Sequence, residues 1–316
     1  MTMRSGVGTI IGRPNAGKST LLNRLVGQKI AIVTHKAQTT RNRIQGYVNV
    51  PAIKGKRPAA QLVLVDTPGV HKPDSPMGRR MMQEVYDSIS GIDLLLVIVD
   101  ATREPDEADE QALLLAKRNR VPCILLLNKV DLLDKTRLLP LIETLKEKHD
   151  FAEIIPISAR KGTGEQELLT ACARLLPPGE RRFDEEEITD QPARFLAAEL
   201  IREKVLLYTA QEVPYAAAVK VERWQDPPKA EAATRIAAVI YCEREGQKGI
   251  IIGRRGTLLK KIGSAARVEL ERLLGGKVLL ELFVKVQENW RESRQFLNDL
   301  DWRQQLEDLS LRERKD

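Results

Sequence analysis

One stretch near the N-terminus has the spacing of a phosphate-binding loop. GRPNAGKST, residues 12–20, matches G-x-x-x-x-G-K-[ST] and lies between an apolar run and a segment with helical periodicity. Backbone N–H groups freed by its glycines, together with the N-terminus of the next helix, would face a phosphate. Lys18 would reach the β- and γ-phosphates, and the Ser19 hydroxyl would bind Mg²⁺. The loop residues expected to line a nucleotide are Gly12, Arg13, Pro14, Asn15, Ala16, Gly17, Lys18, Ser19 and Thr20.

A second motif has the spacing that recognises a guanine base. NKVD, residues 128–131, follows the apolar run CILLL. The Asp131 carboxylate would accept hydrogen bonds from guanine N1–H and the N2 amino group, whereas adenine would leave it unpaired. ISA, residues 157–159, follows another apolar run and would close over the base. The ligand is therefore predicted to be GTP or GDP rather than ATP, held at this end by Asn128, Lys129, Val130, Asp131, Ser158 and Ala159.

A third motif, DTPG, supplies contacts for a metal ion and for the γ-phosphate. Asp66 ends an apolar run and would hold Mg²⁺ through water, and Gly69 would let a backbone N–H approach the γ-phosphate. The intervening and following residues Thr67, Pro68 and Val70 are also expected to line the nucleotide. Together with the two motifs above, this one predicts a GTP hydrolase.

A polar segment between the first and third motifs has the character of a switch loop. KAQTTRNR, residues 36–43, has no apolar periodicity, which is typical of a segment that is ordered only in the presence of the γ-phosphate and Mg²⁺. Thr40 is the predicted metal ligand in this segment, beside Ser19 and Asp66. The sequence leaves the adjacent Thr39 as an alternative.

Val70 occupies the position at which many GTPases carry the glutamine that orients the attacking water. A hydrocarbon side chain cannot orient water by hydrogen bonding, so hydrolysis would depend on Mg²⁺, on Lys18 and on backbone dipoles such as that of Gly69. The sequence therefore predicts slow turnover and a GTP-bound state that persists, as in a molecular switch.

These motifs require strands whose carboxyl ends meet at one edge of a sheet. Short apolar runs at 8–12, 60–67, 93–101, 122–129 and 153–159 alternate with segments of helical periodicity. Runs that are apolar on both faces predict a mostly parallel sheet covered by helices, which is the α/β fold of a P-loop GTPase domain. We expect this domain to span residues 1–176.

The second half of the chain has a different pattern. Residues 177–192 combine prolines, a glycine and a run of charges, and are predicted to form a linker. Beyond the linker, residues 193–316 are predicted to form a smaller α+β domain. Its helices are expected at 193–210, at 257–274 and at the C-terminus, and its strands at 215–224, 234–243 and 277–287.

The composition limits the partners and the compartment. The 316 residues include 51 Lys and Arg against 44 Asp and Glu, and the resulting net charge of +7 favours an anionic partner such as RNA or a phospholipid surface. The three cysteines lie far apart and form no CxxC pair, which argues against a disulfide framework or a zinc site and favours a reducing cytoplasm. The chain lacks an N-terminal apolar core and an apolar run long enough to span a bilayer, so we expect a cytoplasmic protein, at most peripheral to the inner membrane.

The chain as a whole resembles the Era family of GTPases. The resemblance rests on GRPNxGKSTLLN, KAQTTR, DTPG, NKVD and ISA in the first half and on IREK, VPY, EREGQK, IIIGRRG and LFVKV in the second. It implies a monomeric GTPase with a C-terminal type II KH domain, which binds small-subunit ribosomal RNA near its 3′ end and assists assembly of the small subunit. Related GTPases with the same Pro-Asn pair imply that Asn15 helps to hold K⁺ beside the phosphates, so the expected catalytic groups are Lys18, Asn15 and Gly69.

A KH domain clamps about four nucleotides of single-stranded RNA with a G-x-x-G loop. GQKG at 246–249 and GRRG at 253–256 both fit this pattern, and GRRG is favoured because it follows apolar residues and precedes a helix. The segment from Lys248 to Arg267 contains six basic residues and no acidic one. The expected RNA contacts are Lys248, Gly253, Arg254, Arg255, Gly256, Lys260 and Lys261.

The sequence supports a nucleotide-gated RNA clamp as its main interpretation. GTP would order residues 35–43 and 66–80 and so change RNA binding at the GRRG loop, and linkage requires RNA to change GTP affinity by the same factor. The alternative is a membrane-associated signalling GTPase whose basic C-terminal domain binds anionic lipid.

Overall fold

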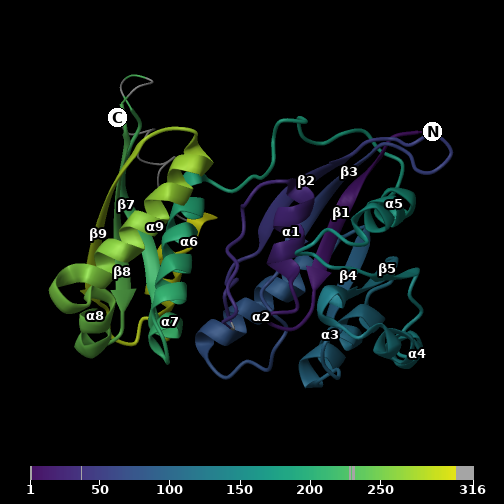
Figure 1. Cartoon of the computed structure of the whole chain (residues 1–316), viewed down its shortest axis with the longest axis horizontal. Helices are drawn as coiled ribbons and strands as arrows, with labels where there is room; N and C mark the ends of the chain where they lie inside the picture. The colour runs from purple at the N-terminus through teal and green to yellow at the C-terminus, as the bar shows by residue number, and fades with distance from the viewer. Residues whose placement is uncertain (1, 37, 228, 230–231, 304–316) are drawn as a thin grey trace. The chain divides into compact units, whose positions relative to one another are not determined.

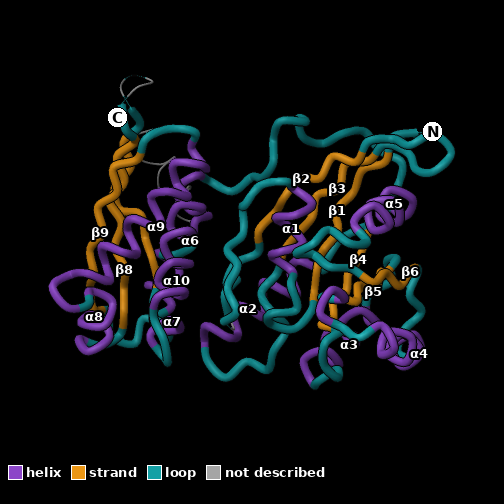
Figure 2. The backbone as a smooth tube through the Cα atoms, viewed as in Figure 1, coloured by secondary structure: helices purple, strands orange, loops and turns teal. Residues whose placement is uncertain are grey.

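The computed structural model describes residues 2–36, 38–227, 229 and 232–303, and it divides into two compact units. The first comprises Met1–Asp74 and Gly78–Asp190, and the second comprises Ser75–Met77 and Gln191–Asp316. Figure 1 shows the elements of each unit, and Figure 2 shows the strands of each unit lying side by side as one sheet.

The first unit is built on a six-stranded sheet of order β2-β3-β1-β4-β5-β6. All neighbouring strands are parallel except β2 and β3, which are antiparallel. Every residue of β3, β4 and β5 is buried, as expected for strands that are covered on both faces. The strands are β1 (Arg4–Ile11), β2 (Ile44–Val50), β3 (Ala60–Asp66), β4 (Leu94–Asp100), β5 (Cys123–Asn128) and β6 (Glu153–Pro156).

Helices cover this sheet through their apolar stripes. A single core cluster joins β4 and β5 to residues of α2, α3 and α4, while α1 contacts β2 and β3 and α5 contacts β3 and β6. The helices are α1 (Lys18–Val26), α2 (Pro76–Ser88), α3 (Glu107–Arg118), α4 (Leu138–Lys146) and α5 (Glu165–Leu175), with 3₁₀ turns η1 (Val130–Leu132) and η2 (Lys135–Arg137). The mostly parallel α/β sheet that the sequence predicts is confirmed.

The segment expected to be a linker lies in large part against the edge strand β2. Tyr47 donates its backbone N–H to the carbonyl of Ile188 at 2.9 Å, and its ring stacks on Phe183 with centroids 3.8 Å apart. The buried Gln61 side chain accepts hydrogen bonds from the backbone of Arg182 and Phe183 and donates one to the carbonyl of Phe183. Residues 182–188 are therefore held against the edge of the first unit's sheet.

The second unit has a three-stranded sheet of order β7-β8-β9, in which β7 and β8 are antiparallel and β8 and β9 are parallel. Helix α6 packs on α9 and on β7. The elements are α6 (Ala193–Tyr208), α7 (Val213–Ala216), β7 (Ala218–Gln225), β8 (Thr234–Cys242), α8 (Glu245–Ile252), the 3₁₀ turn η3 (Arg254–Gly256), α9 (Thr257–Leu274), β9 (Val278–Val286) and α10 (Arg294–Asp299). The smaller α+β unit expected from the sequence is confirmed, but helix α8, which directly precedes the GRRG loop, is absent from the helices that the sequence predicts.

A buried ionic group ties α6 to α9. Lys204 donates to Glu203 at 2.6 Å and also to Glu269 of α9. Burial by itself lowers the pKa of Lys204, but the hydrogen bonds to these two carboxylates outweigh it and raise the pKa above its ordinary value. Lys204 is therefore charged at neutral pH, and the contact fixes the helix that begins immediately after the GRRG loop. Within the described residues, no helix is both long and apolar enough to cross a membrane.

Candidate nucleotide-binding site and RNA-binding loop

The GRPNAGKST loop joins the end of β1 to the start of α1, which is the strand-loop-helix context that the motif requires. Gly17 precedes the helix with a φ of 107°, and a Cβ at this position would overlap the Asn128 amide. Glycine is therefore needed here both for the turn and for the close approach of the base-recognising loop.

Lys18 is buried, and its ammonium points back into the phosphate-binding loop. Its Nζ donates to the carbonyls of Gly12 at 2.9 Å and Arg13 at 2.8 Å. Burial lowers the pKa of Lys18 to about 8, against the opposing attraction of Asp66. Because burial disfavours the charged ammonium of Lys18, an anionic partner such as a phosphate would stabilise that charged form strongly.

Three oxygen-bearing side chains from three different segments meet beside this loop. Ser19 Oγ donates to Asp66 Oδ2 at 2.6 Å, and Thr40 Oγ1 lies 2.9 Å from Ser19 Oγ and 3.4 Å from Asp66 Oδ2. Thr39 instead bonds within its own segment, to Thr34 and to the carbonyl of Lys36. Of the two adjacent threonines, Thr40 is the one that joins the other predicted metal ligands.

The chemistry of this cluster fits Mg²⁺. Asp66 is fully buried, and burial raises its pKa to about 6. Within the described part of the chain its Oδ1 atom has no hydrogen-bond partner. An all-oxygen set of one carboxylate and two hydroxyls, with one carboxylate oxygen still unsatisfied, matches the preference of Mg²⁺ for oxygen ligands.

Asn128 joins the base-recognising loop to its two neighbours. Its amide donates to the carbonyl of Ala16 at 2.7 Å, and its carbonyl oxygen accepts from the N–H of Ala159 at 2.9 Å. Lys129 follows with a φ of 68°, which turns the chain so that Asp131 lines the same pocket. The NKVD loop, the phosphate-binding loop and the ISA loop are thus bound to one another.

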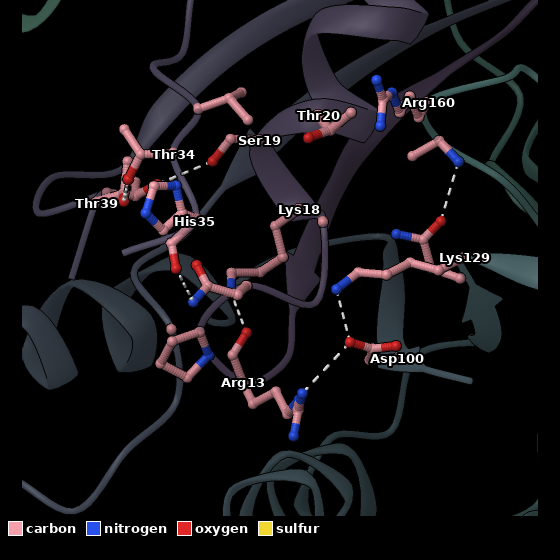
Figure 3. A pocket seen from close by; sticks show the side chains of 18 of the residues that line it. Arg13, Lys18, Ser19, Thr20, Thr34, His35, Thr39, Asp100, Lys129 and Arg160 are labelled. Carbon is pink, nitrogen blue, oxygen red and sulfur yellow. Dashed lines mark hydrogen bonds and ion pairs between the residues drawn. The ribbon is translucent and has the colours of Figure 1, made fainter. Parts of the chain in front are cut away.

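These segments surround a single cavity of about 690 Å³ (Figure 3). Among the predicted nucleotide-binding residues, those that line it are Arg13, Pro14, Asn15, Gly17, Lys18, Ser19, Thr20, Gly69, Asn128, Lys129, Asp131, Ser158 and Ala159, together with the predicted metal ligand Thr40. The other predicted nucleotide-binding residues apart from Val70 are not among the described lining residues; they are Gly12, Ala16, Asp66, Thr67, Pro68 and Val130. Its remaining lining includes Thr34, His35, Asp100, Arg103 and Arg160, for which no motif gave a signal.

Val70 does not face this cavity. Its side chain is completely buried in the core cluster shared with α2 and β4, and its N–H donates to the carbonyl of Gly12 at 3.0 Å. The hydrocarbon that replaces the usual glutamine is therefore part of the hydrophobic core, and its backbone is bound to the phosphate loop.

The GRRG loop of the second unit presents its basic side chains to solvent. Gly253 has a φ of 72°, and a Cβ there would approach that of Leu258 to 2.7 Å, so glycine is required at this position. Arg254, Arg255 and Lys260 are exposed. GQKG, the rejected alternative, lies within helix α8.

Two of the predicted RNA contacts have partners within the second unit. Lys248 forms an ion pair with Glu245 at 3.3 Å, and the Lys261 ammonium lies 4.3 Å from the ring centroid of Tyr208. The exposed positive charge around the loop consequently centres on Arg254, Arg255 and Lys260.

Comparisons with known proteins cover both units. A family model described as a 50S ribosome-binding GTPase matches residues 8–129, and a KH-domain model matches residues 212–291. The chain is 47% identical to the GTPase Era of Geobacter metallireducens over 297 residues, which is 94% of this chain and 97% of that protein. It is 45% identical to the GTPase Era of Ruminiclostridium cellulolyticum, across 96% of this chain and 99% of that protein. The chain belongs to the Era family of GTPases.

Solved structures of Era proteins extend the match to three dimensions. A single-residue variant of Aquifex aeolicus Era bound to GDP·AlF₄⁻ is 39% identical with a TM-score of 0.88, and it matches across 95% of this chain and 99% of its own. An Era structure in complex with MgGDPNP and nucleotides 1506–1542 of 16S ribosomal RNA is 40% identical with a TM-score of 0.89, at the same coverage. This member of the Era family is therefore a GTPase with a C-terminal KH domain, as the sequence predicts.

Proposed function

We propose that this Era-family GTPase is a molecular switch that binds small-subunit ribosomal RNA near its 3′ end and assists assembly of the small subunit. The observation that carries the proposal is the loop from Gly253 to Gly256, with its exposed arginines, in a chain that matches the Era–16S RNA complex along nearly its whole length. The 50S ribosome-binding model covers only residues 8–129 and leaves the KH domain out. The small subunit is therefore the better supported partner.

In the proposed domain arrangement, residues 1–176 form the GTPase domain, 177–192 the linker and 193–316 the KH domain. The KH-domain model spans 212–291, inside the third of these ranges. We propose that the protein acts in the cytoplasm as a monomer, and peripheral contact with the inner membrane is a separate hypothesis that the RNA experiment below also tests.

In the proposed GTP complex, Ser19, Thr40 and Asp66 hold Mg²⁺, which supplies positive charge against the β- and γ-phosphates. Lys18 exchanges its two loop carbonyls for the phosphates, and Gly69 offers its N–H to the γ-phosphate. Asp131 accepts from the guanine N1–H and N2 amino group. All of these groups except Asp66 line one cavity, and Asp66 accepts hydrogen bonds from the lining residues Ser19 and Thr40, which supports assigning them to one ligand.

Asn15 is the proposed partner of an additional K⁺ ion. It adopts a φ of 63°, lines the cavity, and donates its amide to the carbonyl of His35 in the switch segment at 2.8 Å. This amide therefore lies between the phosphate loop and the switch. The test is GTP turnover in KCl and in NaCl for the wild type and Asn15→Asp, and identical rates in both salts for both proteins would eliminate K⁺ from the proposal.

The RNA proposal is tested with a labelled RNA that copies the 3′ end of 16S ribosomal RNA. Arg254→Glu with Arg255→Glu reverses the charge of two exposed side chains of the loop. Arg272→Glu with Lys277→Glu makes the same charge change at exposed sites at the far end of α9. We expect the first pair to weaken binding at least tenfold more than the second. It should also reduce the slope of log affinity against log salt concentration more, because that slope is about 0.7 per phosphate neutralised on a single strand. Equal effects of both pairs would remove the loop from the interface.

The same RNA titration also tests whether the bound nucleotide controls RNA binding and whether the basic domain binds lipid instead. Binding is measured with GDP and with a non-hydrolysable GTP analogue, and tighter binding in the GTP-like state gives the coupling factor directly. Anionic vesicles are then added as a competitor. Displacement of RNA by vesicles at equal charge concentration would favour the membrane-associated signalling GTPase instead.

A further inference from the structure

The carboxylate of Asp100 bridges two loops that bind opposite ends of the nucleotide. Asp100 ends strand β4 and is 4% exposed. Its Oδ2 atom accepts from the Lys129 ammonium at 2.6 Å and from the Arg13 guanidinium at 3.4 Å (Figure 3). Lys129 belongs to the base-recognising NKVD loop, and Arg13 to the phosphate-binding loop. A single oxygen atom is thus shared by both.

The other oxygen of the same carboxylate is used to orient it. Asp100 Oδ1 accepts from the Thr102 backbone N–H at 3.1 Å and from the Thr102 hydroxyl at 2.6 Å. Burial alone raises the pKa of Asp100, but the hydrogen bonds from Lys129 and Thr102 outweigh it and hold the pKa below its ordinary value. The bridge is therefore ionised and fixed in orientation at neutral pH.

The two cations depend on this carboxylate to different degrees. Arg13 is buried and also binds Asp106 at 2.8 Å and Asp109 at 3.9 Å, both in or beside the first turn of α3. For Lys129, the described residues provide one ion pair, that with Asp100. Loss of the Asp100 charge leaves Arg13 with two carboxylate partners but removes the ion pair of Lys129. The contact between the two loops is therefore lost, while Arg13 stays bound to Asp106 and Asp109.

Resting on the proposed GTP complex, we propose that Asp100 is a positioning residue that fixes the NKVD loop relative to the phosphate-binding loop, so that the guanine and the diphosphate are bound as one rigid unit. Asp100 touches none of the reacting atoms in this scheme and acts through Lys129 and Arg13. Two loops that are fixed relative to each other lose less entropy when a ligand spans both of them. Selectivity for the base and selectivity for the phosphates are therefore coupled through one side chain.

The test measures the affinities of GDP, GMP and IDP for nucleotide-free full-length protein. The ratio of the GMP to the GDP dissociation constant reports the phosphate end, and the ratio of IDP to GDP, which differ only in the N2 amino group, reports the base end. For Asp100→Asn we expect GDP to bind about tenfold more weakly, the scale of one hydrogen bond to a charged group, and both ratios to fall.

Asp106→Asn is the matched control, because it removes one carboxylate charge from Arg13 while asparagine still caps α3. We expect it to lower only the GMP-to-GDP ratio. If Asp100→Asn leaves both ratios at the wild-type value, or lowers only the ratio that Asp106→Asn lowers, Asp100 is a structural partner of Arg13 and the proposal is wrong. Thr102→Val, which removes only the hydroxyl bond to Oδ1, repeats the test if Asp100→Asn does not fold, and unchanged ratios in that variant overturn the proposal as well.

Discussion

Replacing Thr40 by valine removes one hydroxyl from the proposed Mg²⁺ cluster and keeps the shape of the side chain. The Thr40 hydroxyl is 2.9 Å from Ser19 Oγ and 3.4 Å from Asp66 Oδ2, and the residue is 8% exposed. A polar contact to a charged group is worth about 1.5–3 kcal/mol, which corresponds to a factor of roughly 10 to 150 in affinity. We therefore expect Thr40→Val to weaken Mg²⁺-dependent binding of a GTP analogue by this factor and to leave GDP binding nearly unchanged, because switch segments contact the ligand in the triphosphate state.

The adjacent threonine provides the matched control. Thr39 is also buried, and its hydroxyl bonds to the Lys36 carbonyl at 2.7 Å and to the Thr34 hydroxyl at 2.7 Å, within its own segment. Thr39→Val therefore loses neutral hydrogen bonds of about 0.5–1.5 kcal/mol each, with no special dependence on Mg²⁺.

The assay is a titration of a fluorescent, non-hydrolysable GTP analogue at a series of Mg²⁺ concentrations, with the fluorescent GDP derivative in parallel. The expected result is a shift of the Mg²⁺ midpoint for the Thr40 variant alone. Equal shifts for both variants, or a larger shift for Thr39→Val, would refute the assignment of Thr40 as the metal ligand.

The remaining predictions concern the base, the attachment of residues 182–183 and the cysteines. Asp131→Asn is expected to lower GDP affinity by at least about 10²-fold and to favour XDP, because the C2 carbonyl oxygen of xanthine accepts a hydrogen bond from the asparagine amide. An unchanged GDP/XDP preference would exclude Asp131 from base recognition. Gln61→Leu removes three hydrogen bonds to the backbone at 182–183 and is expected to lower the free energy of unfolding by about 2–3 kcal/mol in urea titrations, whereas the same change at the exposed Gln83 is expected to alter it by less than about 0.5 kcal/mol. Burial raises the pKa of Cys123 and Cys172 to about 12, so little thiolate is present at pH 8. A thiol reagent is therefore expected to react rapidly with these two cysteines only after unfolding. Fast labelling of them in the native protein would contradict their burial.

The sequence predicts the parallel strands well because each carries its own signal. A run such as LLLVIVD in β4 is apolar on both faces and ends in the polar residue that the site uses, so its pattern specifies strand, burial and edge at once. Strand β2 is absent from the strands that the sequence predicts. Its sequence, IQGYVNV, contains a glycine and polar residues, because it is antiparallel, lies at the edge of the sheet and is flanked partly by residues 182–188.

Contacts between distant segments could not be predicted from local patterns. Residues 177–192 have the composition of a linker, and nothing in them reveals that the buried Gln61 side chain satisfies the backbone at 182–183. The same limit applies to Asp100. Its place at a strand end was visible, but the approach of Arg13 and Lys129 to one oxygen atom depends on the fold of both loops.

Val70 illustrates how a motif position and a spatial position can differ. Directly after the DTPG motif it stands where a water-orienting amide is usual in GTPases, but its side chain is fully buried in the core cluster and its backbone N–H binds the phosphate loop. A glutamine placed here in the same conformation would bury its amide among hydrocarbons instead of presenting it to the γ-phosphate. The predicted slow hydrolysis thus depends on the direction of the chain after Gly69 as much as on the identity of residue 70, and we expect any group that orients the water to come from the cavity lining or from a binding partner.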